Sequence, residues 1–257
     1  MFGRIKQILQ NLFGKKEKTA NIESTSISRT PLVSSQGSTR SNREEDHSAE
    51  AQLNIFLDKY LYARFPTGSS FSSIRRTHDK SEQLSGVDVE FVGTDGRIYF
   101  VDEKAQLHYL NQNLPTFAFE LLSYQKGYDT VGWLCNSKLK TDFYMLVWPF
   151  ATQDSYKGIT YQQFTQADCL LVQKQKLLKM LGSKGLTVER MMADANEIRR
   201  DGKTGKIPIP GIRGIYYYAS QSHKYKEAPI NIVISKQILI TIAQRRYIVS
   251  SDTITTE

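Results

Sequence analysis

The sequence lacks any apolar run that approaches the roughly 20 residues a helix needs to cross a membrane. Cysteine is also scarce, with only Cys135 and Cys169 in 257 residues. These two form no recognisable disulfide framework, redox motif or zinc-ligand spacing. We therefore expect a cytoplasmic protein whose fold depends on its hydrophobic core alone, and 257 residues provide ample core for that.

The sequence also lacks the motifs of several enzyme classes. It contains no Gly-x-Ser-x-Gly, no Cys/His dyad signature and no internal repeat. Gly202-Lys203-Thr204 imitates the end of a phosphate-binding loop, but the first glycine of that motif would fall at Glu197, which excludes an NTPase of that type. His78 has no second histidine at a metal-ligand spacing, so we expect it at the surface.

Basic side chains outnumber acidic ones, and the two kinds are unevenly distributed along the chain. The formal net charge is +8. Residues 46–170 carry 11 basic and 15 acidic side chains, whereas residues 171–257 carry 15 basic and 7 acidic ones. An acidic middle segment beside a basic C-terminal third suits a polyanionic partner such as nucleic acid.

The first 45 residues differ in composition from the rest. Within residues 2–13, Phe2, Ile5, Leu9, Leu12 and Phe13 share one helical face, while Arg4 and Lys6 interrupt any signal-peptide core. We expect either a short amphipathic helix that contacts a partner or a membrane surface, or a frayed terminus. Residues 14–43 are rich in small polar residues and predict a disordered linker, so residues 1–45 are expected to lie outside the folded domain at 46–257.

The remaining pattern predicts an α/β fold with a central mixed β-sheet flanked by helices. We expect a core at about 48–149 and a basic extension at about 150–257. For residues 116–121 the alternation predicts a strand, although a helix over residues 115–127 also fits. The predicted helices are 48–64, 174–181, 187–200 and a short one ending at 243, and the predicted strands are 71–77, 116–121, 142–149, 168–172, 215–219 and 229–235.

A hairpin in residues 86–106 brings the most informative polar residues together. Two apolar runs flank the pair Asp95-Gly96, which is a strong hairpin signal between such runs. A hairpin that folds about Asp95 pairs residues at equal distances from it, which sets Asp88 opposite Asp102. Two facing carboxylates repel one another, so the arrangement suggests a bound cation.

The alternation of strand side chains adds two residues to the same face. With a period of two, Lys104 and Gln106 lie on the face of Asp102. Asp88, followed on the next strand by Asp102-Glu103-Lys104, resembles the signature of the PD-(D/E)XK nuclease superfamily. Val87 stands where the usual proline precedes the first aspartate, and Gln106 resembles members in which a glutamine follows the lysine.

The resemblance implies a restriction-endonuclease-like core and a set of site residues. Asp88 and Asp102 would bind Mg²⁺ or Mn²⁺ together with the backbone carbonyl of Glu103. Members often bring a glutamate from the first helix to the metal, and Glu50 matches that placement. In the strand interpretation of residues 116–121, Glu120 is a further candidate ligand. The candidate catalytic residues are Asp88, Asp102, Lys104 and Gln106.

Basic and aromatic side chains outside the hairpin suggest where DNA binds. Arg75 and Arg76 are expected to face phosphate or solvent. The loop at residues 201–214 carries Lys203, Lys206 and Arg213 and is predicted to contact the DNA backbone, with a solvated loop as the alternative. The tyrosines at positions 216–218 either stack on bases or pack in the core, and packing is favoured.

The sequence therefore predicts a metal-dependent deoxyribonuclease. A nuclease-like module that binds nucleic acid without cleaving it is the alternative, and the intact Asp88, Asp102 and Lys104 argue against it. A partner- or membrane-tethered adaptor led by residues 2–13 remains a further alternative, but it gives no explanation for the carboxylate pair.

Overall fold

The computed structural model describes residues 41–65, 71–125, 127–220 and 228–257. The amphipathic segment predicted at residues 2–13 and most of the predicted linker lie outside the described residues. Helix α2 (Ser41–Tyr60) comes first, followed by a short 3-10 helix at Tyr62–Arg64. The helix thus includes residues 41–45, which the composition had assigned to the linker.

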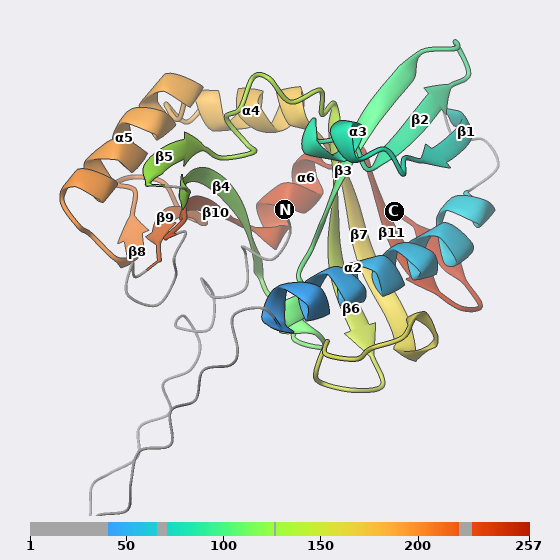
Figure 1. The fold of residues 1–257 in the computed structure, drawn as a ribbon. Coiled ribbons are helices and arrows are strands. Elements are labelled where there is room, and N and C mark those ends of the chain that lie inside the picture. Colours follow the sequence, from blue (N-terminus) through green and yellow to red (C-terminus); the bar gives the residue numbers. More distant parts are fainter. Residues whose placement is uncertain (1–40, 66–70, 126, 221–227) are drawn as a thin grey trace, which may run out of the picture.

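A seven-stranded mixed sheet forms the larger layer of the fold (Figure 1). Its strand order is β1-β2-β3-β6-β7-β11-β12. Strands β3 and β6 run parallel, and the other neighbouring pairs are antiparallel. The strands are β1 (Phe71–Arg76), β2 (Val89–Gly93), β3 (Ile98–Ala105), β6 (Phe143–Ala151), β7 (Phe164–Gln173), β11 (Arg245–Ser250) and β12 (Ile254–Thr256).

A second, five-stranded antiparallel sheet lies beside the first, in the order β5-β4-β10-β9-β8. The sequence pattern did not predict this sheet as a separate layer, and β8 falls within the expected loop at residues 201–214. The strands are β4 (Thr116–Gln125), β5 (Tyr128–Val131), β8 (Gly205–Pro208), β9 (Ile215–Ala219) and β10 (Ile230–Ser235). Residues 116–121 are therefore a strand and not a helix.

Four further helices complete the described fold. They are α3 (Lys80–Leu84), α4 (Lys174–Gly182), α5 (Val188–Arg200) and α6 (Lys236–Ile242). Short 3-10 helices occupy Leu107–Tyr109 and Tyr161–Gln163. The side chain of Thr187 accepts a hydrogen bond from the Arg190 N–H and so caps the N-terminus of α5. Within the described residues, every helix is too short or too polar to span a bilayer.

Both faces of the seven-stranded sheet are buried. Successive side chains of its central strands point alternately into two hydrophobic clusters, one on each face. On β6, Met145 and Val147 face the cluster that contains Leu53 and Phe56 of α2. Tyr144, Leu146 and Trp148 of the same strand face the other cluster, where the five-stranded sheet packs. Figure 1 shows α2 lying across the strands of the larger sheet. The molecule is thus an α/β protein with a large mixed sheet flanked by helices.

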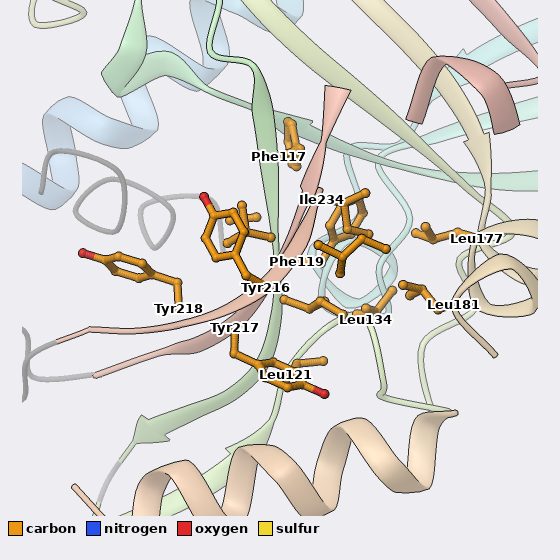
Figure 2. Close-up of a cluster of buried hydrophobic side chains, with 14 of the residues drawn as sticks. Phe117, Phe119, Leu121, Leu134, Leu177, Leu181, Tyr216, Tyr217, Tyr218 and Ile234 are labelled. Carbon is orange, nitrogen blue, oxygen red and sulfur yellow. The ribbon is translucent and has the colours of Figure 1, made fainter. Parts of the chain in front are cut away.

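The second cluster takes most of its side chains from the five-stranded sheet and α4 (Figure 2). Phe117 and Phe119 of β4 lie fully buried in it. The tyrosines at positions 216–218 are all at most 8% exposed, and the Tyr217 hydroxyl donates to Asp194 of α5 at 2.9 Å. The prediction that these tyrosines pack in the core is confirmed.

Candidate active site

The hairpin of β2 and β3 has the register that the turn predicted. Val89 pairs with Val101, and the Asp88 N–H donates to the Val101 carbonyl at 2.9 Å. Gly96 adopts a φ of 79°, which glycine tolerates best, and so completes the turn. Asp88 and Asp102 therefore meet at the open end of the hairpin.

Strand β3 presents different groups on its two faces. Asp102 and Lys104 pair with Tyr144 and Leu146 of the parallel strand β6, so they lie on the face that packs toward the five-stranded sheet. Glu103 lies on the opposite face, toward α2, where it meets Arg76. The β3 backbone between them is thus held from both sides.

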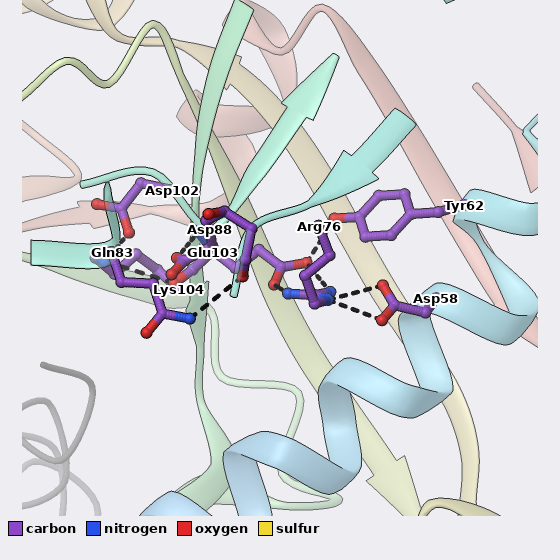
Figure 3. A network of polar contacts seen from close by, with 9 residues as sticks. Asp58, Tyr62, Arg76, Gln83, Asp88, Asp102, Glu103 and Lys104 are labelled. Atoms are coloured by element: carbon purple, nitrogen blue, oxygen red, sulfur yellow. Dashed lines mark hydrogen bonds and ion pairs between the residues drawn. The ribbon is translucent and has the colours of Figure 1, made fainter. Parts of the chain in front are cut away.

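A cavity of about 350 Å³ opens at this end of the hairpin and gathers the candidate residues. Asp88, Asp102 and Lys104 line it from the sheet, and Glu50 lines it from α2. Figure 3 shows Asp88, Asp102 and Lys104 close together, with Arg76 and Asp58 on the α2 side of Glu103. The other lining residues are His47, Leu53, Asn54, Leu57, Lys80, Gln83, Leu84, Gly86, Glu103, Ala105 and Val147.

Each carboxylate of the hairpin is held by one oxygen. Asp88 Oδ2 accepts a hydrogen bond from the Glu103 N–H at 2.8 Å, and Asp102 Oδ1 forms an ion pair with Lys104 Nζ. The second oxygen of each accepts no hydrogen bond from the described residues. The Lys104 ammonium also lies 5.3 Å from the centre of the Trp133 ring, which fixes its direction.

The charge on Asp88 is unfavourable in this setting. Burial and the nearby charge of Asp102 raise the pKa of the Asp88 carboxyl well above its usual value, although Lys104 acts in the opposite direction. A bound cation would remove this repulsion. The hairpin therefore places two carboxylates close together in a buried site, where a bound cation would stabilise their ionised forms.

Glu50 extends the acidic set from α2. Burial raises its pKa to about 7, while the positive charge of Lys104 acts to lower it. Its Oε2 lies 3.4 Å from Nδ1 of His47, one turn earlier in the helix. The resemblance implied a glutamate from the first helix at the metal, and Glu50 of α2 lines the same cavity as Asp88.

A buried ionic network behind Glu103 was not anticipated from the sequence. Arg76 donates to both oxygens of Asp58 at 2.8 Å and to Glu103 Oε1 at 3.1 Å, and the Tyr62 hydroxyl donates to Glu103 Oε1 at 2.6 Å. Arg76 therefore faces neither phosphate nor solvent, which corrects the sequence-based expectation. The neighbouring Arg75 is exposed and bonds Glu90.

Two of the candidate residues lie outside the lining of the cavity. The chain leaves strand geometry after Ala105, and the Gln106 amide donates to the Thr116 carbonyl at 2.8 Å, where it joins β3 to β4. Glu120 lies on β4 in the five-stranded sheet, opposite Asn231. It is buried there.

The basic loop predicted at residues 201–214 has local partners. Lys203 forms an ion pair with Asp201 at 2.9 Å, and Lys206 lies 4.4 Å from the centre of the Tyr216 ring. His78 is exposed, as predicted.

The donor set of the cavity has the chemistry of a site for a hard divalent cation. Among the described residues, no three His, Cys, Asp or Glu side chains are grouped closely enough to hold a metal ion by themselves. The set available is instead two carboxylates, Asp88 and Asp102, and the backbone carbonyl of Glu103. Oxygen donors of this kind suit Mg²⁺, which usually keeps several waters and takes few protein ligands.

Comparisons of the chain with protein-family models, with curated proteins and with solved structures find no match. A functional assignment therefore depends on the residues and geometry of the chain itself.

Proposed function

We propose that this protein is a metal-dependent nuclease that hydrolyses phosphodiester bonds in DNA. The observation that carries the proposal is the convergence of Asp88, Asp102 and Lys104 on one cavity at the end of the β2–β3 hairpin. Two carboxylates beside a lysine provide both a cation site and a positive group for a phosphate. The basic C-terminal third supports a polyanionic substrate.

The chain's own residues divide the chemical roles. Asp88 and Asp102, with the Glu103 carbonyl, bind Mg²⁺ or Mn²⁺. When bound, such an ion orients the scissile phosphate and lowers the pKa of an attacking water. Glu50 is a candidate for an additional ligand, because it lines the same cavity.

Lys104 acts on the substrate. Asp102 and the Trp133 ring hold its ammonium group in the cavity, so little side-chain freedom is lost when a phosphate binds. The ammonium donates a hydrogen bond to the phosphate or to the attacking water and offsets the negative charge that develops on the phosphate oxygens.

The restriction-endonuclease-like core at about 48–149 is part of the same proposal. It is supported by Asp88 followed by Asp102-Glu103-Lys104 at matching register in a hairpin. A binding module without catalysis has one observation in its favour, because each aspartate already has a partner within the protein. A DNA cleavage assay distinguishes the nuclease from the binding module.

The test compares matched carboxylate variants in a DNA cleavage assay. Linear, circular and single-stranded DNA are incubated with Mg²⁺, with Mn²⁺ or with a chelator. Wild type is expected to cleave at least one substrate in a metal-dependent manner, and Asp102→Asn is expected to lose that cleavage. The matched control is Glu90→Gln, which neutralises a buried carboxylate on β2 that bonds Arg75 outside the cavity. If wild type binds DNA but none of the three substrates is cut with either metal, the binding module is the correct assignment.

Removal of the charge on Asp88 is expected to leave the metal-free protein as stable as wild type or more stable, by about 1 kcal/mol. The asparagine oxygen can still accept from the Glu103 N–H, so the shape and the hydrogen bond are kept. Because the folded-state pKa of Asp88 is raised, folding free energy is lost as the pH rises above the ordinary aspartate pKa, and Asp88→Asn escapes that loss. Thermal unfolding in chelator measures the difference.

Adding Mg²⁺ should then raise the melting temperature of wild type and leave that of Asp88→Asn almost unchanged, because only wild type gains binding energy in the folded state. A clear destabilisation of the metal-free Asp88→Asn would instead identify Asp88 as a structural hydrogen-bond acceptor and remove the main support for the cation site.

A further inference from the structure

A group of exposed lysines begins at the rim of the cavity and continues away from it. Lys80 of α3 lines the cavity itself. Lys138 and Lys140 lie between β5 and β6, and Lys176 and Lys179 lie one turn apart on α4. All five are exposed, and no acidic side chain among the described residues forms an ion pair with any of them. We call these five residues the lysine track.

Backbone contacts join the three segments that carry the track. The Lys140 N–H donates to the Ser85 carbonyl at 2.9 Å, and the Thr141 hydroxyl donates to the Gly86 carbonyl at 2.9 Å, directly at the cavity wall. The Lys174 N–H donates to the Asp142 carbonyl at 2.8 Å, which ties the start of α4 to the same segment. Figure 1 shows α3, this segment and α4 following one edge of the molecule.

Lys174, the first residue of α4, interacts electrostatically with Asp102 of the candidate active site. Burial lowers the pKa of Lys174, and the charges of Asp102 and Asp142 act in the opposite direction. The ammonium of Lys174 bonds the Asn136 carbonyl at 3.4 Å, so it is held within the protein. The exposed lysines of the track continue outward from this point.

Three exposed or half-buried basic residues elsewhere in the C-terminal third have acidic partners. Arg190 pairs with Asp194 at 2.7 Å, Lys203 pairs with Asp201 at 2.9 Å, and Arg246 pairs with Asp168 at 2.9 Å. In contrast, α4 contains no acidic residue. Lys176 and Lys179 are therefore exposed positive charges with no acidic side chain on their own helix.

We propose that the lysine track binds the phosphate backbone of the nucleic acid whose scissile phosphodiester lies in the cavity. This inference rests on the proposed function for the identity of the ligand. Lys176 and Lys179 are three residues apart, a rise of about 4.5 Å along α4, which is close to the roughly 3.4 Å axial spacing of phosphates in one DNA strand. Among the described residues of α3, 132–142 and α4, Leu84 alone is a large apolar side chain exposed to solvent, which is too little to anchor a membrane or a protein partner.

The experiment measures DNA binding without cleavage. Full-length wild type and the variant Lys138→Gln/Lys176→Gln/Lys179→Gln are titrated against a fluorescent DNA duplex in chelator at several salt concentrations. The slope of log K against log salt should fall in magnitude by about 0.9 for each phosphate that the variant no longer neutralises. All three positions are exposed, so the melting temperature should stay at the wild-type value.

The matched control is Lys203→Gln/Lys206→Gln/Arg213→Gln, which removes the same formal charge from the loop that the sequence predicted to bind DNA. Its slope is expected to change by less than the slope of the track variant. An unchanged slope for the track variant, or an equal change in both triples, overturns the proposal. Wild-type binding to phosphatidylserine vesicles in preference to the duplex overturns it as well.

The outcomes also separate this inference from the proposed function. If the slope of log K against log salt changes in the track variant but no DNA is cleaved, the track is supported as a DNA-binding surface and the nuclease function is rejected. Cleavage that requires Asp102 but shows no track-dependent slope would retain the nuclease and reject the track. In the cleavage assay, the track variant should raise KM and leave kcat near the wild-type value, because its residues lie away from the scissile phosphate.

Discussion

Replacement of Lys104 by alanine is expected to reduce metal-dependent DNA cleavage by about 10²- to 10³-fold, the cost of losing one positioned donor to a developing negative charge. The ammonium is buried and pairs with Asp102 at the cavity, whereas Lys80, the other lysine that lines the cavity, is exposed and is not paired with Asp102. DNA binding in chelator should change little, because one positive charge of many is removed.

Loss of activity through unfolding must be distinguished from loss of chemistry. Without Lys104, the Asp102 carboxylate is left buried beside Asp88, so Lys104→Ala should be less stable than wild type in chelator. A cation would compensate for the missing ammonium. Mg²⁺ is therefore expected to raise the melting temperature of Lys104→Ala by more than that of wild type, even though cleavage is lost.

The chain offers a closely matched control in Lys236. Its ammonium pairs with Asp168 at 2.6 Å and lies 4.3 Å from the centre of the Trp148 ring, as Lys104 pairs with Asp102 beside Trp133. Lys236→Ala should cleave at the wild-type rate at temperatures where it remains folded. A wild-type rate for Lys104→Ala would show that the assignment of the site is wrong.

The hairpin and its carboxylates could be predicted because they depend on local rules. The Asp95-Gly96 turn fixes the register, and a period of two then fixes the faces, so the approach of Asp88 to Asp102 follows from sequence spacing. The Gln106 amide also points toward the five-stranded sheet, where it donates to Thr116, but the chain turns into a 3-10 helix directly after Ala105 and Gln106 does not line the cavity. The resemblance suggested Glu50 of α2 as a further acid, and it lines the same cavity.

The five-stranded sheet could not be predicted because its order depends on pairing between distant segments. Strand β4 pairs with β10, more than 100 residues later in the chain, and local patterns do not reveal such partners. Strand β11 was missed because its first two residues, Arg245 and Arg246, disguise the apolar alternation of Tyr247 and Val249.

The pairing of Arg76 with Glu103 could have been predicted from the registers of the strands. Arg76 pairs with Val89, and Val89 pairs with Val101, so all three share one face. A period of two along β3 adds Glu103 to that face. An arginine and a glutamate on one buried face of a sheet are expected to pair, because a buried charge requires a partner.

Arg76→Met is therefore expected to destabilise the protein by roughly 3–5 kcal/mol, the range for breaking a buried ion pair from one side. The Arg76 side chain is 11% exposed and bonds two acids, Asp58 and Glu103. Its loss leaves the buried Glu103 carboxylate with only the Tyr62 hydroxyl. Chemical or thermal unfolding in chelator measures the change.

The adjacent Arg75 provides the control. It also binds a carboxylate, Glu90 at 2.6 Å, but its side chain is 70% exposed. Arg75→Met should change the free energy of unfolding by about 0–1 kcal/mol, as exposed pairs do. Similar decreases in the free energy of unfolding for the two variants would show that burial of the Arg76 network does not contribute to stability.

The network also bears on the candidate site, because Glu103 lies between its two key residues. Its N–H holds Asp88, and its side chain is held by Arg76, so the network fixes the β3 backbone from the α2 side. The double variant Arg76→Met/Glu103→Gln removes both charges and should recover part of the stability lost in Arg76→Met. If it also recovers the Mg²⁺-dependent rise in melting temperature, the network positions the site through Glu103. Recovery of stability without that rise would restrict the network to a role in folding.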